Sequence, residues 1–346
     1  MKKILSLIAL TVLLAGCNSN KPGSSTSSVE SIQPSSSEPT VSESSSTDST
    51  SEVPTFDRTS LSIITPTGAP ALAFYNYANL SNFETNSNPQ TGIIPLMVSG
   101  QKDVVVLPTN AGVQAIKNKN ANYQLAATIT FGNFYLVSMG NDSNNQLDAG
   151  DKVLLFQQGN VPDKVFHYVY GNTYDSNVYY VSAVSDAAAA ANAGSFVDAE
   201  SGNRITPNYV MLAEPVLTNV LKNKTNITVY ADMQAKYAEK SNNLPLFQAS
   251  VFIKKTVERN KAEAFLGSLK EDIEAAIKEP TLMSAGMNKT TEPQVLFGVA
   301  PQMAENVLKK NNGMGLGFKN AKENKAAVNN FLQLFGIEGL NEEVYF

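Results

Sequence analysis

The sequence predicts an α/β protein with mostly parallel sheets, and three observations support this prediction. Apolar segments of strand length alternate with helix-like segments along residues 57–346. Some of the strands are nearly uninterrupted apolar runs, such as the run that ends at Leu107, which is typical of strands buried on both faces. This part is roughly 290 residues long, which is long for one core and sufficient for two lobes.

Residues 1–16 have the pattern of a lipoprotein signal peptide. A basic start is followed by about eleven apolar residues, too few to span a bilayer, which takes about 20. The run ends in Leu14-Ala15-Gly16-Cys17, which resembles the bacterial lipobox, in which the cysteine is lipidated and begins the mature protein. An ordinary signal peptide with an incidental cysteine is the alternative. Cys17 is the only cysteine, so no intramolecular disulfide can form, and acylation would explain its presence.

Residues 17–56 contain the lipidated cysteine and then mainly Ser, Thr, Pro and Glu, with almost no large apolar side chain. Such a segment cannot bury enough surface to offset its ordering entropy, and we predict a disordered linker. The linker would have a root-mean-square reach of roughly 35 Å. The protein is therefore expected on the extracytoplasmic face of the cell membrane, held by its lipid. Formal net charge is -5 and no basic patch indicates nucleic acid. Nothing in the linker favours assembly, so we expect a monomer.

The predicted elements follow from apolar periodicity and from breakers such as Pro70 and Gly171. The predicted strands are 61–65, 103–107, 125–130, 134–138, 152–156, 178–182, 209–213, 227–230 and 247–253. The predicted helices are 71–80, a segment that Thr109 or Asn110 caps, 161–170, 186–193, and two C-terminal segments with apolar faces at 262–277 and 327–335.

One arrangement occurs three times: an apolar strand, a loop of small and polar residues, and a helix start. It is found at 65–70, 108–112 and 157–162. In open α/β sheets ligands bind outside the carboxyl ends of the strands, where helix N-termini present backbone N–H groups. We therefore expect the three loops to offer free N–H groups, hydroxyls and amides to one cleft.

At this point the chain resembles a known family. The segments "PTGAPALAFYNYA", "GQKDVVVLPTNAGVQAI" and "AATITFGNFYLV" are similar to the first lobe of bacterial ABC-transporter substrate-binding proteins, in the group for nitrate, sulfonate, taurine and thiamine precursors. "QQGNVPDKVFHYV" and "YVMLAEPVLTNVL" resemble later elements of that group. The resemblance implies a periplasmic-binding-protein-like fold of type II, two lobes that close around a ligand, and docking on an ABC permease with its ATPase.

The same resemblance implies two strands that cross between the lobes, which we place near 135–140 and 247–251. Lobe one would be 57–139 plus 248–346, and lobe two 140–247. Ligand contacts are expected from the loops, the crossing and the Glu-Pro strand end: Thr65, Thr67, Gly68, Ala69, Pro108, Thr109, Asn110, Asn133, Tyr135, Gly159, Asn160, Val161 and Glu214. Thr109 and Asn110 would face the cleft while they cap their helix.

The nature of the ligand stays open. Sulfonates and carboxylates are often held by arginine, and Arg58, Arg204 and Arg259 are all outside the candidate loops. A neutral or amine-bearing heterocycle fits at least as well, with Glu214 accepting from an amine. Glu214 has an alternative role as a helix cap. Phe131, Phe134 and Tyr135 are candidates for stacking on a ring, or else for the core.

An enzyme is not predicted. His167 is the only histidine and lies within a predicted helix, where a structural role is expected. With one histidine and an acylated cysteine, metal sites of zinc or copper type lack ligands, and no metal is expected. No cofactor is expected either. No nucleophile elbow, P-loop or H-E-x-x-H motif is present. We predict a membrane-anchored solute receptor of an ABC importer. The alternatives are a ligand-sensing lipoprotein acting on a signalling partner and, less favoured, an enzyme on the same fold such as a small-carboxylate dehydratase.

Overall fold

The computed structural model describes residues 56–141 and 146–346. The predictions for the signal peptide, for Cys17 and for the linker up to residue 55 lie outside the described residues. Both large sheets belong to one compact unit, Glu52–Phe346.

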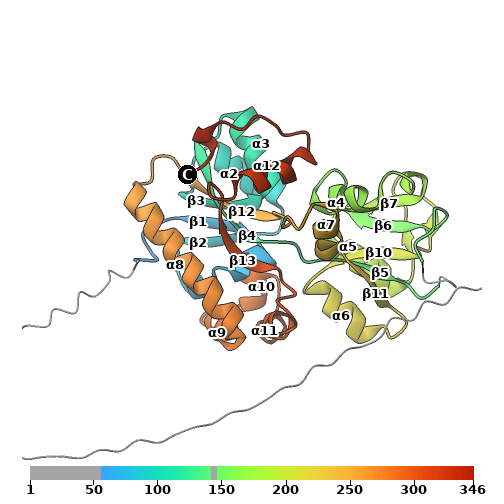
Figure 1. Ribbon diagram of the computed structural model, residues 1–346. Coiled ribbons are helices and arrows are strands. Elements are labelled where there is room, and N and C mark those ends of the chain that lie inside the picture. Colours follow the sequence, from blue (N-terminus) through green and yellow to red (C-terminus); the bar gives the residue numbers. More distant parts are fainter. Residues whose placement is uncertain (1–55, 142–145) are drawn as a thin grey trace, which may run out of the picture. The chain divides into compact units, whose positions relative to one another are not determined.

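The first sheet has six strands in the order β13-β4-β12-β3-β1-β2 (Figure 1). β1 runs parallel to both β2 and β3, whereas β12 is antiparallel to β3 and β4, and β13 is antiparallel to β4. The strands are β1 (Ile63–Pro66), β2 (Phe83–Asn86), β3 (Val104–Pro108), β4 (Tyr123–Thr130), β12 (Ala249–Lys254) and β13 (Leu316–Asn320).

The second sheet has five strands in the order β11-β5-β10-β6-β7. β6 is parallel to β7 and β10, and β5 is antiparallel to β10 and β11. The strands are β5 (Phe134–Ser138), β6 (Val153–Phe156), β7 (Val178–Val181), β10 (Tyr209–Ala213) and β11 (Thr228–Asp232), with a small separate hairpin of β8 (Phe196–Val197) and β9 (Arg204–Ile205).

The α/β class is confirmed, but both sheets are mixed, so the expectation of mostly parallel sheets was wrong. The reason is the way the chain passes between the sheets. β5 and β12 each begin just after such a passage and lead the chain away from it, while β10 and β3 beside them run toward it. This topology makes β12 antiparallel to β3 and β5 antiparallel to β10. The further antiparallel pairs are β12 with β4, β13 with β4, and β5 with β11.

The first passage also lies earlier than predicted. The whole of β5 pairs with β10, from Phe134 opposite Ala213 to Ser138 opposite Tyr209, so this strand belongs to the second sheet. The passage is therefore the segment 131–133 between β4 and β5, and not 135–140. The second passage between the sheets includes Phe247 and Gln248, just before β12. Apolar pattern shows that a strand is buried but not which sheet it joins, which explains the error.

Helices cover both faces of the first sheet, with α3 and α12 on one face and α8 and α9 on the other (Figure 1). β3 shows why its sequence is continuously apolar: Val105 and Leu107 pack in one core, while Val104 and Val106 pack in the other. The helices are α1 (Ala69–Leu72), α2 (Ile94–Val98), α3 (Thr109–Lys119), α4 (Val161–Tyr170), α5 (Val184–Ala193), α6 (Val216–Asn223), α7 (Met233–Lys240), α8 (Arg259–Lys278), α9 (Pro280–Met287), α10 (Pro293–Phe297), α11 (Pro301–Lys309) and α12 (Lys325–Gln333).

The prediction of one helix over residues 71–80 was wrong. α1 ends at Leu72, and a short 3-10 turn at Tyr75–Tyr77 follows. Tertiary packing explains the interruption, because Phe74 is fully buried with its ring 5.5 Å from that of Phe83 and 6.5 Å from that of Phe265.

Candidate ligand-binding cleft

A cleft of about 280 Å³ gathers the carboxyl ends of strands from both sheets. The loops after β1, β2 and β3 contribute from the first sheet, and those after β6, β7 and β10 from the second. Both passages between the sheets also contribute. Its lining is Pro66, Thr67, Gly68, Ala69, Pro70, Ser87, Pro89, Pro108, Asn133, Phe134, Phe156, Gln157, Asn160, Val161, Pro162, Ala183, Val184, Ala213, Glu214, Pro215, Val216, Gln248, Ala249 and Gly298. The location is the one at which α/β sheets bind ligands.

Eight of the thirteen residues expected to contact the ligand line this cleft: Thr67, Gly68, Ala69, Pro108, Asn133, Asn160, Val161 and Glu214. Five do not line it: Thr65, Thr109, Asn110, Tyr135 and Gly159. Thr65 is completely buried in β1, and Tyr135 lies within β5, so both are set back from the strand ends.

Thr109 and Asn110 do not cap their helix, contrary to expectation. Pro108 is the N-cap of α3, without a side-chain hydrogen bond, and both residues lie within the first turn. The Thr109 hydroxyl instead lies 2.7 Å from that of Ser250, which is 2.7 Å from that of Thr128. The three hydroxyls form a buried chain between α3, β12 and β4, so Thr109 supports the cleft from behind.

Several of the backbone N–H groups that the three loops were expected to offer already have acceptors. Thr67 donates to the carbonyl of Asn86 at 3.4 Å and Gly68 donates to that of Phe297 at 2.8 Å. The N–H of Thr109 donates to Gln248 O at 3.1 Å, and that of Gly159 donates to the Asp163 carboxylate at 2.7 Å. The cleft therefore offers an anion fewer donors than the sequence indicated.

Among the described residues, Glu214 is the only charged one in the lining. It is 9 % exposed, and each of its carboxylate oxygens accepts from Thr218, one from the backbone N–H at 3.0 Å and one from the hydroxyl at 2.8 Å. The carboxylate thus caps the first turn of α6, which is the alternative role considered above. Burial raises the pKa of Glu214, and the two bonds from Thr218 offset this only in part.

Asn133 and Gln248 connect the two passages. The side-chain amide of Asn133 donates to Glu214 O at 2.7 Å, and Glu214 N–H donates back to Asn133 O at 3.0 Å. Gln248 Nε2 donates to Asn133 Oδ1 at 3.1 Å. Sequence reasoning missed Gln248, although its position at the start of the returning strand was a usable signal.

No arginine or lysine of residues 56–141 and 146–346 lines the cleft. Arg58 forms an ion pair with Asp272 and lies 5.3 Å from the ring centroid of Tyr77, and Arg259 pairs with Glu263 at 2.8 Å. Of the three aromatic residues considered for stacking, only Phe134 lines the cleft, with its ring 5.9 Å from that of Phe156 on β6. Phe131 packs edge-on against Phe247 at 5.8 Å.

His167 has a structural place behind the loop that precedes α4. Its Nδ1 lies 2.9 Å from Asp163 Oδ1 and its Nε2 lies 3.1 Å from Asp175 Oδ1. The hydrogen bond to Asp163 is the main cause that raises the pKa of His167 to about 9. Burial alone would raise the pKa of Asp163, but hydrogen bonds from His167, Gly159 and Tyr180 outweigh it and lower that pKa.

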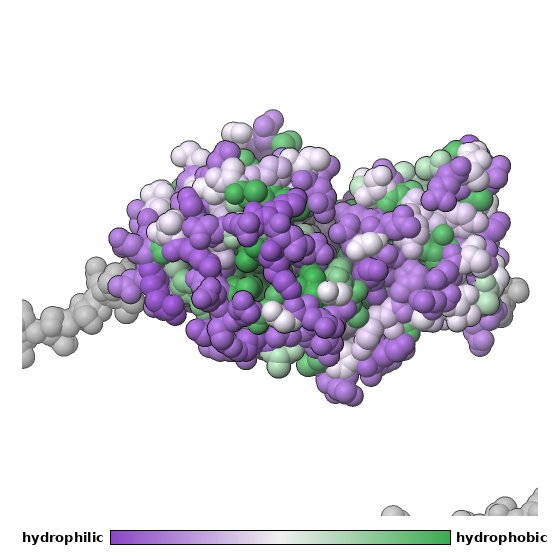
Figure 2. Space-filling model, turned by 90° about the horizontal axis from the view of Figure 1, so that it is seen from above, coloured by the Kyte–Doolittle hydropathy of each residue, from purple (hydrophilic) through white to green (hydrophobic). Residues whose placement is uncertain are grey.

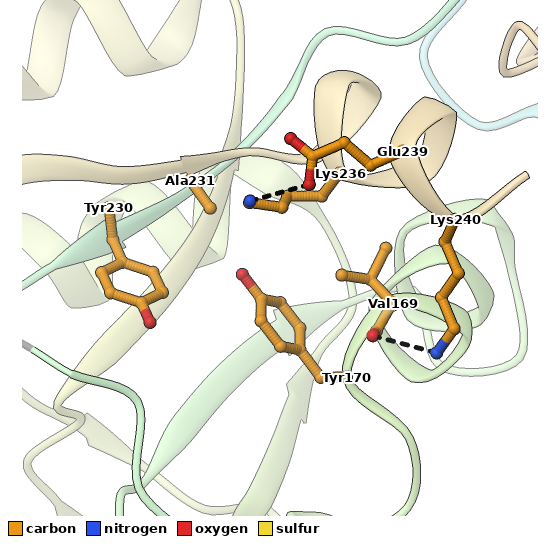
Figure 3. Close-up of a pocket in the computed structure, with 7 residues that line it drawn as sticks. All are labelled: Val169, Tyr170, Tyr230, Ala231, Lys236, Glu239 and Lys240. Carbon is orange, nitrogen blue, oxygen red and sulfur yellow. Dashed lines mark hydrogen bonds and ion pairs between the residues drawn. The ribbon is translucent and has the colours of Figure 1, made fainter. Parts of the chain in front are cut away.

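A larger hollow of about 610 Å³ lies elsewhere, between α4, β11 and α7 (Figure 3). Its two lysines are already engaged: Lys236 pairs with Glu239 at 2.9 Å, and Lys240 donates to Val169 O at 3.2 Å (Figure 3). The hollow gathers no set of strand ends. We therefore take the smaller cleft as the candidate site.

The described residues contain no group of three or more His, Cys, Asp or Glu side chains placed to hold a metal ion. Within the same residues, no helix is long and apolar enough to cross a bilayer. Hydrophilic residues dominate the face in Figure 2, and hydrophobic ones form small separate patches.

Comparison with known proteins gives two findings. Residues 1–18 match the model of a prokaryotic membrane lipoprotein lipid attachment site. The match confirms the lipobox at Cys17, and the protein is a lipoprotein anchored on the extracytoplasmic face of a membrane. A comparison with curated protein sequences found no match.

Several solved structures are similar in fold. A crystal structure described as an ABC transporter from Parabacteroides distasonis has a TM-score of 0.61 and 20% identity, covering 79% of this chain and 90% of that one. The aliphatic sulphonate-binding protein SsuA from Escherichia coli has a TM-score of 0.58 and 11% identity, covering 79% and 86%. A ligand-binding component of an ABC-type import system from Staphylococcus aureus, with zinc bound, has a TM-score of 0.54 and 9% identity, covering 82% and 94%. The chain therefore has the fold of the periplasmic binding proteins.

Proposed function

We propose that this lipoprotein binds a small molecule in the cleft between its two sheets and delivers it to an ABC importer. The observation that carries the proposal is the cleft itself, where six strand ends and both passages meet in a chain with a binding-protein fold. Residues 56–133 and 248–346 would form one lobe, and residues 134–247 the other. Closure about the two passages would trap the ligand and create the surface that a permease and its ATPase recognise.

The lining indicates the charge of the ligand. With one carboxylate and no cation among the described lining residues, and with several loop N–H groups engaged, the cleft is poorly suited to sulfonate or nitrate. A neutral or positively charged small molecule suits it better. The proposed contacts are Thr67, Gly68, Ala69, Pro108, Asn133, Asn160, Val161 and Glu214, to which the structure adds Gln248, Phe134 and Phe156.

The test is a ligand screen by thermal unfolding. The mature chain from residue 17, carrying Cys17→Ser to release it from the membrane, would be unfolded and refolded to remove bound ligand. The panel would contain sulfonates, nitrate, pyrimidines, amino acids and sugars. A ligand present at about 1,000 times its dissociation constant adds roughly 4 kcal/mol to the free energy of unfolding, which raises Tm by several degrees.

A clear rise in Tm with one class of ligand supports the receptor function. If no class raises Tm, the receptor function is contradicted. A rise only with sulfonates would preserve the receptor and contradict the inference about charge. The fold alone does not separate import from signalling. Uptake of the identified ligand by cells, with and without this chain, distinguishes them, because a signalling lipoprotein would leave uptake unchanged.

A further inference from the structure

The orientation of the Gln248 side chain is determined by a relay of hydrogen bonds. The carbonyl oxygen of Glu214 can only accept, so Asn133 must turn its Nδ2 toward it, at 2.7 Å. Asn133 Oδ1 is then an acceptor, and Gln248 must present its Nε2 to it, at 3.1 Å. Gln248 Oε1 is left over, and this buried oxygen has no hydrogen-bond partner.

Two further unpaired atoms lie behind Gln248 and outside the lining of the cleft. Asn110 Oδ1 and Thr130 Oγ1 are both buried without a partner. They adjoin Gln248 through the backbone, because Gln248 N–H donates to Thr130 O at 3.0 Å and Thr109 N–H donates to Gln248 O at 3.1 Å. Buried polar atoms without a partner are rare in folded proteins, and each of them calls for an explanation.

The unpaired atoms are mainly acceptors. Two of the three are amide oxygens, which accept, and the threonine hydroxyl can accept as well as donate. Among the described residues, neither lysine nor arginine lines the cleft, and its one charged group is the carboxylate of Glu214. Of the three residues only Gln248 lines the cleft, so a ligand that complements its Oε1 must bring a hydrogen-bond donor.

We propose that Gln248 is a specificity-determining residue that accepts a hydrogen bond from an N–H group of the ligand. The ligand class is a small planar ring compound, neutral or cationic, with an amino or ring N–H group. Phe134 and Phe156 both line the cleft and pack edge-on against each other, and about 280 Å³ limits the ligand to one or two rings. This inference rests on the proposed receptor function and adds the chemistry of its ligand.

Because Gln248 also bonds to Asn133, an N–H group bound to Gln248 would be linked to both passages and to Glu214. Selection of the ligand and closure of the lobes would then depend on the same side chains. An acceptor-only compound of the same shape would leave Gln248 Oε1 unpaired and bind more weakly.

The test uses matched probes and titration calorimetry on the refolded mature chain carrying Cys17→Ser. The probes are cytosine and uracil, their fully N-methylated forms, in which no N–H donor is left, and methanesulfonate. The wild-type protein should bind at least one N–H probe at least tenfold more tightly than the methylated form of that probe. Gln248→Met, which has a similar shape and no acceptor, should remove that preference. Gln302→Met, on the exposed face of α11, should keep it.

Equal affinity of the wild-type protein for N–H and methylated probes would overturn the inference while leaving a receptor. So would binding of methanesulfonate alone, or an unchanged preference in Gln248→Met. If none of the probes binds, the proposed ligand class is overturned. The broader thermal screen then tests separately whether the protein is a receptor for a small molecule. Should Gln248→Met not fold, Gln248→Leu provides the second variant, which also has no acceptor and should remove the same preference.

Discussion

The backbone N–H of Gly159 donates to the carboxylate of Asp163 at 2.7 Å. This bond ties the loop that carries Gln157 and Asn160 into the cleft to the first turn of α4. The same carboxylate accepts from the hydroxyl of Tyr180 at 2.8 Å, so β7 takes part as well. The shape of this side of the cleft thus depends on a buried carboxylate that does not line it.

Asp163→Asn should therefore loosen the loop and lower stability. The amide has one acceptor oxygen in place of two and loses the charge that faces His167, and we expect a loss of about 2 kcal/mol in the free energy of unfolding. Urea unfolding measures it. Asp175→Asn, at an exposed carboxylate that also contacts His167, is the matched control and should cost much less. Equal losses in both variants would contradict the role given to Asp163.

Stability should fall at alkaline pH because of His167. Its pKa is raised to about 9, so its contribution is fully present below the unfolded value of about 6.5 and is lost as pH rises through about 9. After discounting for solvent screening of a partly exposed ring, we expect a loss of roughly 1 kcal/mol across that window. Urea unfolding at several pH values measures it, and His167→Gln should flatten the slope. A slope that His167→Gln leaves unchanged would exclude this histidine as its source.

Thr109→Val should destabilise the protein through the buried hydroxyl chain. The variant keeps the shape of the side chain but leaves Ser250 with one partner fewer, at a cost of about 1–2 kcal/mol. Thr109→Ser keeps the hydroxyl and should cost less. Because Thr109 does not line the cleft, ligand affinity should change less than twofold in a variant that folds. A large loss of affinity at unchanged stability would show direct contact with ligand instead.

Gly315 supports the first passage and should not tolerate a side chain. It has φ +64°, its carbonyl accepts the N–H of Phe131 at 2.7 Å, and a Cβ there would lie 1.8 Å from the carbonyl oxygen of Gly132. Gly315→Ala should cost about 3 kcal/mol or more, from overlap added to backbone strain. Gly202→Ala, at φ +71° with no atom within 4 Å of its Cβ, isolates the strain and should cost about 1 kcal/mol. Thermal unfolding of both variants provides the comparison.

Cys17→Ser should release the protein from the membrane. The lipid attachment site at residues 1–18 includes this cysteine, and serine cannot form the thioether on which the anchor depends. Fractionation of bacterial cells should move the chain from the membrane to the soluble extracytoplasmic fraction. Ser19→Ala is the control and should remain on the membrane. Retention of Cys17→Ser on membranes would mean that another part of the chain holds it there.

The sequence by itself determined the features that depend on local pattern. Helix α4 begins and ends where predicted, at Val161–Tyr170, because a proline in its first turn and Gly171 after its end mark it locally. Strands β5 and β10 also have the predicted bounds. The lipobox is a contiguous motif and was likewise readable from sequence.

Tertiary structure alone decided which elements meet. The apolar pattern of β5 could not show that it pairs with β10, so the first passage between the sheets was misplaced. The loops were correctly expected to meet in one cleft, but their N–H groups find acceptors such as Phe297 O and the Asp163 carboxylate through folding. Gln248 is an ordinary glutamine in the sequence. Its unpaired oxygen follows from a relay through Asn133 and Glu214, residues 115 and 34 positions away along the chain by their numbers, that only the fold brings together.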